Sequence, residues 1–179
     1  MPVSKLPPIL DFHTCTDLNQ TDVLDTLFEP SPAIHATLLP VIRTAEYSSW
    51  TDLIDACQIR LLALATSTEA RPTSTLDPTL LCVLGSHPRL GEKKIESAHS
   101  AAEQANIQKG ASDAQEAELA RLNRQYEETF PGLRYVVFVN GRGRPEILDD
   151  MRSRIARADY TKEVDAALQV GGRQANQRS

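Results

Sequence analysis

The sequence lacks the features that nucleic-acid-binding and membrane-spanning proteins need. Its 19 Lys and Arg residues are outnumbered by 24 Asp and Glu residues, and the basic residues do not cluster on any one predicted element. The net charge of −5 argues against nucleic acid or an anionic membrane surface as the main partner. No apolar run approaches the roughly 18 residues of a membrane span. Residues 1–10 contain three prolines and no apolar core of a signal peptide.

Cysteine is also scarce. Cys15, Cys57 and Cys82 are far apart and odd in number, and no Cys-x-x-Cys or Cys/His ligand spacing occurs. This pattern argues against structural zinc and favours free, mostly buried thiols in a reducing compartment. The chain does not end in a Ser-Lys-Leu peroxisomal signal. We therefore expect a cytoplasmic protein, with peroxisomal import by another route left open.

Apolar residues recur at helical spacing along most of the chain. Caps and prolines bound the expected helices. These cover residues 22–28, residues 32–39 ended by Pro40, a stretch from Thr51 to Leu64, residues 95–108, residues 112–130 behind a capping box at Ser112 and Gln115, residues 146–158, and a last helix from Thr161. Residues 67–78 are polar and predict a surface loop, and the apolar run 80–84 predicts a buried segment.

One short stretch does not follow the helical pattern. The β-branched and aromatic residues Tyr135, Val136, Val137, Phe138 and Val139 predict an extended conformation. A lone strand has no partner for a sheet, so the predicted class is all-α, with one extended segment at about 134–139 buried between helices. A chain of 179 residues can bury a single core. We expect one helical domain over residues 1–179, with an N-terminal arm over residues 1–20.

The strongest candidate for chemistry is His87, at a break between two helical segments. Pro88 restricts His87 to an extended backbone, which aims the imidazole. Ser100, Glu103 and Gln104 follow at spacings that place a hydroxyl, a carboxylate and an amide on one helical face. An imidazole beside a carboxylate suits general acid–base catalysis. The residues alone leave two other interpretations open, a structural histidine and a solvated helix face.

A metal site is not expected. His99 and Glu103 are four residues apart, but no third ligand is in view.

Several motifs together resemble 2-oxo-4-hydroxy-4-carboxy-5-ureidoimidazoline (OHCU) decarboxylases, in a form similar to fungal members. They are His87-Pro88-Arg89-Leu90-Gly91, Ser100-x-x-Glu103-Gln104, Leu122-Asn123-x-x-Tyr126 and Phe130-Pro131-Gly132-Leu133, continued by residues 135–142 and 146–155. The resemblance covers about residues 22–178. It implies an all-α, usually dimeric enzyme without metal or organic cofactor, hence a homodimer here. It also implies the last step from urate to (S)-allantoin, in which OHCU loses CO2.

The resemblance also implies which residues act. The catalytic histidine and glutamate fall on His87 and Glu103, and the family's C-terminal arginine falls on Arg178, with Arg173 as the alternative. The implied substrate-binding positions are Pro88, Ser100, Gln104 and the main chain of Tyr135, Val136, Val137, Phe138 and Val139.

Two departures from the family pattern bear on these roles. Arg89 stands where the family often has aspartate, and we expect its side chain to face away from the substrate. Gly171 and Gly172 are expected to interrupt the last helix, at a cost of roughly 1 kcal/mol each. Arg178 then lies near a frayed end.

Two alternatives of a different kind remain from the sequence. One is a helical interaction module without chemistry, in which His87 and Glu103 are solvated or independently satisfied. The other is a different small-molecule lyase or hydrolase on the same scaffold.

Overall fold

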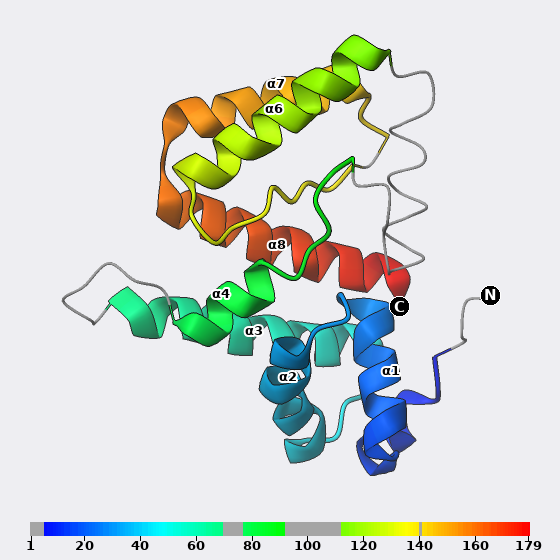
Figure 1. Cartoon of the computed structure of the whole chain (residues 1–179). Coiled ribbons are helices and arrows are strands. Elements are labelled where there is room, and N and C mark those ends of the chain that lie inside the picture. Colours follow the sequence, from blue (N-terminus) through cyan, green and yellow to red (C-terminus); the bar gives the residue numbers. More distant parts are fainter. Residues whose placement is uncertain (1–5, 70–76, 92–111, 140) are drawn as a thin grey trace. The chain divides into compact units, whose positions relative to one another are not determined.

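The computed structural model describes residues 6–69, 77–91, 112–139 and 141–179, and all of the regular secondary structure in these residues is helical (Figure 1). Within these residues no strand occurs, which confirms the all-α class. In chain order the elements are the 3-10 helix η1 (Ile9–Thr14) and the helices α1 (Asp17–Leu27), α2 (Pro32–Thr44), α3 (Trp50–Glu69), α4 (Pro78–Leu84), α6 (Asp113–Thr129), α7 (Arg144–Arg157) and α8 (Tyr160–Arg178).

The chain divides into two compact units. The first comprises Met1–Leu80 and Gly171–Ser179, and the second comprises Leu81–Val170. The boundary therefore falls inside α4 and again inside α8. A single domain over residues 1–179, with an arm over residues 1–20, stays a prediction.

In the first unit, α2 packs against α1, α3 and η1. The ring of Phe12 in η1 lies 5.0 Å from the ring of Trp50 at the start of α3. The largest fully buried apolar side chains of this unit are Phe12, Leu24, Leu27, Leu38, Ile42, Leu53, Ile54 and Leu80.

Side-chain caps start α1 and α3 earlier than the apolar pattern predicts. The Thr16 hydroxyl accepts a hydrogen bond from the backbone N–H of Asn19, so α1 begins at Asp17 rather than at residue 22. The Ser49 hydroxyl accepts from the backbone N–H of Asp52, so the predicted cap at Thr51 was wrong. At its other end α3 runs to Glu69, into the predicted loop.

Pro40 lies inside α2 and does not end it, which corrects the predicted stop at residue 39. A proline inside a helix removes one backbone hydrogen bond and costs about 3 kcal/mol. Continuing the helix to Thr44 buries Ile42, which is fully shielded like Leu38 one turn earlier. We attribute the continuation of α2 past Pro40 to the burial of Ile42. The rule that proline ends a helix considers the local backbone only and takes no account of such burial.

Gly171 and Gly172 likewise lie within α8, so the predicted interruption was wrong. A Cβ built on Gly172 would lie 2.5 Å from Oε1 of Gln58 in α3, whereas a Cβ on Gly171 would meet nothing within 4 Å. At residue 172 the absent side chain leaves room for the Gln58 carboxamide.

In the second unit, α6 and α7 lie side by side (Figure 1). The capping box at Ser112 and Gln115 is present, as predicted. The predicted apolar stripes of α6, α7 and α8 are buried, which confirms the helical spacing. They consist of Leu119, Leu122, Tyr126, Phe130, Ile147, Leu148, Met151, Ile155, Val164, Ala167 and Leu168.

The thiols are less buried than the sequence predicts. Only Cys57 is buried, and burial raises its pKa to about 12. Cys15 is half-buried and Cys82 is exposed, so the prediction of mostly buried thiols was wrong. Helix geometry explains the exposure of Cys82. Leu80, Val83 and Leu84 are buried, which leaves Cys82 on the outer side of α4.

Candidate active site

His87 lies in the turn that follows α4, after Gly85 and Ser86. Ser86 closes this helix, because its backbone N–H and its hydroxyl donate to the carbonyl of Val83 at 3.2 and 2.6 Å. His87 and Pro88 are both half-buried. We refer to residues 85–91 as the His87 turn.

Helix α6 holds the far end of the His87 turn. The buried Asn123 amide donates to the carbonyl of Leu90 at 2.8 Å. One helical turn earlier, Leu119 packs against Gly91, whose φ is +87° and whose absent Cβ would lie 2.9 Å from a Leu119 methyl group. Only glycine suits both the left-handed backbone and the close approach. The two contacts fix the backbone that follows His87.

A third contact of the His87 turn with α6 is ionic. Arg89 donates to both carboxylate oxygens of Glu127, at 2.8 Å from Nε and through a second, shorter bond from an Nη atom. The guanidinium is thus directed toward α6. Arg134, at the start of the extended segment, donates to the same carboxylate at 2.5 Å. Glu127 therefore bridges the His87 turn and residue 134.

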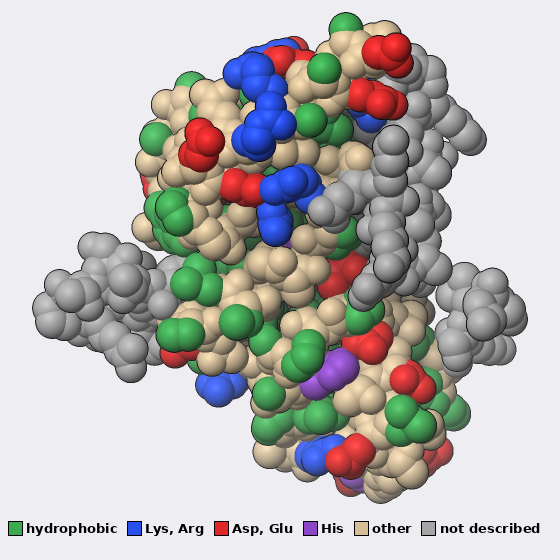
Figure 2. Space-filling view, viewed as in Figure 1, with side chains coloured by type: hydrophobic (Ala, Val, Ile, Leu, Met, Phe, Trp, Pro, Cys, Tyr) green, Lys and Arg blue, Asp and Glu red, His purple; other side chains and the backbone are tan. Residues whose placement is uncertain are grey.

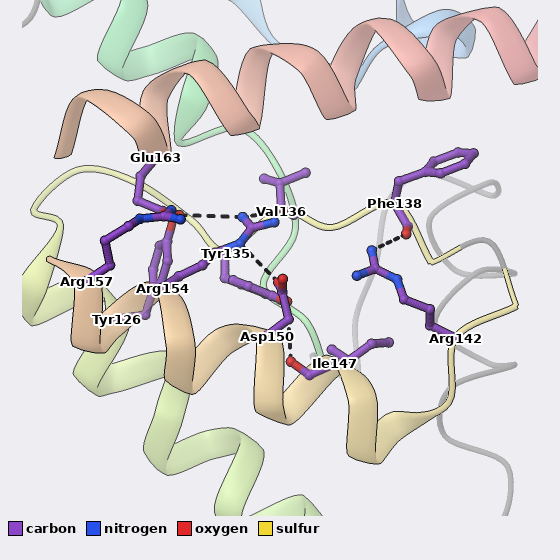
Figure 3. Close-up of polar contacts among 10 residues, drawn as sticks. All are labelled: Tyr126, Tyr135, Val136, Phe138, Arg142, Ile147, Asp150, Arg154, Arg157 and Glu163. Atoms are coloured by element: carbon purple, nitrogen blue, oxygen red, sulfur yellow. Dashed lines mark hydrogen bonds and ion pairs between the residues drawn. The ribbon is translucent and has the colours of Figure 1, made fainter. Parts of the chain in front are cut away.

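Residues 133–139 have no regular secondary structure, and side chains from nearby elements anchor them (Figure 3). The Tyr135 hydroxyl lies 2.5 Å from Asp150, and Arg154 donates to the Val136 carbonyl at 3.2 Å. Arg142 donates to the Phe138 carbonyl at 2.5 Å. Tyr135, Val136 and Val137 are buried, as the sequence predicts.

A buried carboxylate, Glu163 of α8, shares Arg154 with this segment. The Glu163 side chain is 0% exposed, and it accepts hydrogen bonds from Tyr126 at 2.8 Å and from Arg157 at 2.5 Å. A third donor, Arg154, is 3.5 Å away (Figure 3). Because a buried carboxylate is costly without partners, these donors are what makes the burial tolerable.

Two tyrosine hydroxyls of this network are held protonated. Burial first, and then the neighbouring Glu163, raise the pKa of Tyr126 above its ordinary value. Burial and Asp150 do the same for the pKa of Tyr135. These phenols therefore act as hydrogen-bond donors to carboxylates, and neither is suited to accept a proton near neutral pH.

Arg178 belongs to the first unit and is buried rather than frayed. Its side chain is 4% exposed, and it donates to the Phe28 carbonyl at 2.6 Å and to the Glu29 carboxylate at 3.2 Å. The expectation of fraying was wrong, because these acceptors lie at the end of α1 and hold the last turn of α8. The alternative residue, Arg173, is exposed.

Three predicted site residues, Ser100, Glu103 and Gln104, lie outside the described residues, as does the helix predicted over residues 95–108. The other predicted residues of the second unit are described, and they lie in the His87 turn and in the extended segment. Glu127 joins these two segments through Arg89 and Arg134. The roles of the predicted residues in binding or catalysis stay predictions.

The sequence did not single out Glu127, Asp150 or Arg154, nor Glu163 as a buried ion-pair partner. For Glu127 and Glu163, the partners Arg89 and Tyr126 lie far along the chain, so spacing carries no signal. Asp150 and Arg154 are four residues apart in α7 and form an ion pair, which was a local signal in the sequence.

In the part of the chain that is described, no group of three His, Cys, Asp or Glu side chains is placed to hold a metal ion. None of the helices in that part is long and apolar enough to cross a membrane. On the face drawn in Figure 2, basic side chains lie beside acidic ones.

The comparison with protein families decides the family. The model of the OHCU decarboxylase family matches residues 14–178, which is nearly the whole chain and includes the His87 turn, α6 and the extended segment. The chain belongs to the OHCU decarboxylase family. A search of curated proteins gave no match. Membership in the OHCU decarboxylase family makes the His87 turn and the segment it is tied to the leading candidates for a site.

Proposed function

We propose that this protein is a carboxy-lyase that converts OHCU to (S)-allantoin and CO2 in urate degradation, without metal or organic cofactor. The observation that carries the proposal is the family match over residues 14–178. The anchoring of the His87 turn on α6 supports it, because acid–base groups act best when held in place.

The reaction sets what the site must do. The bond between the ring carbon and the carboxylate breaks and CO2 leaves. The bonding electron pair moves toward the adjacent C=N bond of the ring, whose nitrogen takes up a proton from water. The substrate hydroxyl becomes a carbonyl and gives up its proton, and a ring carbon gains a proton on one face. The site must therefore stabilise developing charge and deliver one proton selectively.

We assign these tasks as follows. His87 and Glu103 contact the hydroxyl and carboxyl region and steer the cleavage, and one of them or a held water delivers the proton. Pro88, Ser100, Gln104 and the main-chain groups of residues 135–139 orient the ring and the ureido group. Arg178 holds the substrate carboxylate or a carbonyl with its planar set of donors.

The environment of Arg178 is consistent with a held donor. Its guanidinium is already oriented by the Phe28 carbonyl and the Glu29 carboxylate. The homodimer and the cytoplasmic location stay predictions.

The test is to supply freshly generated OHCU and to follow its loss together with optical activity. Wild-type protein should accelerate the loss and give an excess of (S)-allantoin. Decay at the rate of the protein-free sample, with racemic product, would contradict the proposal. In that case the protein would be a helical interaction module or a lyase that acts on another substrate.

A further inference from the structure

Glu127 is the one described carboxylate that joins the two segments on which the proposed function depends. It lies in α6 and accepts from Arg89 of the His87 turn and from Arg134 at the start of the extended segment. Neither segment is part of a helix or strand. Backbone ladders therefore do not fix their positions, and contacts with α6 and α7 do so instead.

The cluster of Glu127, Arg89 and Arg134 is partly shielded from solvent. The Glu127 side chain is 22% exposed, and those of Arg89 and Arg134 are each 36% exposed. Arg89 uses the two-pronged geometry in which arginine grips both carboxylate oxygens. Such a pair fixes direction as well as distance, so the position of Arg89 constrains His87 two residues earlier.

We propose that Glu127 is a positioning residue for the reaction, which sets the His87 turn and the extended segment at a fixed spacing. This inference rests on the proposed function. Glu127 itself does not contact substrate in this account. It acts through Arg89 on the imidazole and through Arg134 on the main chain that follows.

Helix α6 supplies a matched control. Glu118 also bridges two arginines, Arg121 in its own helix and Arg152 in α7. Neither arginine belongs to the His87 turn or to residues 133–139. Replacing either carboxylate removes the same chemistry from the same helix, and only Glu127 is connected to the proposed site.

The test compares Glu127→Gln with Glu118→Gln on OHCU. Glu127→Gln should lower kcat/KM on the order of tenfold, since small displacements of reacting groups are costly. Glu118→Gln should stay within about twofold of wild type by the same reasoning. Two further single variants separate the effect of the Arg89 contact from that of the Arg134 contact. Arg89→Gln should act mainly on kcat through His87, and Arg134→Gln mainly on KM through the extended segment.

Amide hydrogen exchange gives a readout that does not depend on activity. Exchange in residues 85–91 and 133–139 should be faster in Glu127→Gln than in wild type or Glu118→Gln. Equal exchange in both variants, with equal kcat/KM, would overturn the inference. If wild type does not act on OHCU, the proposed function fails, and the exchange comparison still decides whether Glu127 orders both segments.

Discussion

Arg154 makes three polar contacts through a single guanidinium group. It lies 3.0 Å from the Asp150 carboxylate, 3.5 Å from the buried Glu163 carboxylate and 3.2 Å from the Val136 carbonyl. A planar fork of five donors can serve three acceptors in different directions. The ammonium group of lysine keeps the charge but concentrates its donors at one point.

Arg154→Lys should therefore leave the protein folded but loosen the extended segment. We expect kcat/KM on OHCU to fall on the order of tenfold, measured by steady-state kinetics. Arg154→Gln should in addition lower the free energy of unfolding by about 3 kcal/mol, because it removes a countercharge from a buried carboxylate.

The control for Arg154 is Arg152→Lys in the same helix. Arg152 is bound by the exposed Asp149 and by Glu118, away from the extended segment. An equal loss of kcat/KM in the Arg152 variant would contradict a specific role for Arg154.

Among the elements, α8 shows how two adjacent glycines can differ. Gly171 faces open space, whereas Gly172 lies under the Gln58 carboxamide of α3. Both are helical, so each carries the entropic cost of glycine in a helix.

Gly171→Ala should raise the free energy of unfolding by about 1 kcal/mol, because alanine is the better helix former and nothing blocks its methyl group. Gly172→Ala should gain less or lose stability, since its methyl group must displace Gln58. Urea unfolding of the two variants provides the measurement. An equal gain in both would show that the Gln58 contact has no energetic consequence.

The elements also show where local patterns suffice. The capping box at Ser112 and the apolar stripe of α6 predict a helix that the structure contains. The same kind of rule fails at Pro40 and at Gly172. At Pro40 the burial of Ile42 outweighs the local preference of proline. At Gly172 the contact with Gln58, far along the chain, does the same for glycine.

At the scale of the whole molecule, the sequence predicted the all-α class and the position of the buried extended segment. It also located His87 after a helix end. It did not reveal Glu127, Arg154 or Glu163 as anchors, since contacts between different segments, such as those of Glu127 with Arg89 and of Arg154 with the Val136 carbonyl, leave no periodic trace. Arg178 was expected to fray because of Gly171 and Gly172, and its acceptors, about 150 residues away, gave no local signal against that expectation.

The pH dependence of stability should also reflect the whole set of ion pairs. Hydrogen bonds from Arg121 and Arg152 hold the pKa of Glu118 at about 2, and the Lys162 backbone N–H lowers the pKa of Asp159. The folded chain therefore binds fewer protons than the unfolded chain in mild acid. These contributions are present above the ordinary carboxyl pKa and are lost as pH falls through the lowered values.

Urea midpoints of wild type should thus decrease between about pH 5 and pH 2.5. Glu118→Gln should show a shallower decrease, because it lacks one of the titrating groups. The pairs are exposed, so the difference at neutral pH should be small. Parallel curves for the two proteins would contradict the lowered pKa of Glu118.

The proposed role of His87 in the reaction of OHCU can be tested by comparing three proteins. The initial rate of OHCU loss and the enantiomeric excess of allantoin are measured for wild type, His87→Gln and His35→Gln. His35 is paired with Asp25 in the first unit and serves as the matched control. We predict that His87→Gln falls to the uncatalysed rate with racemic product, while His35→Gln behaves as wild type. A His87→Gln protein that keeps the wild-type rate and the (S) excess would contradict the account.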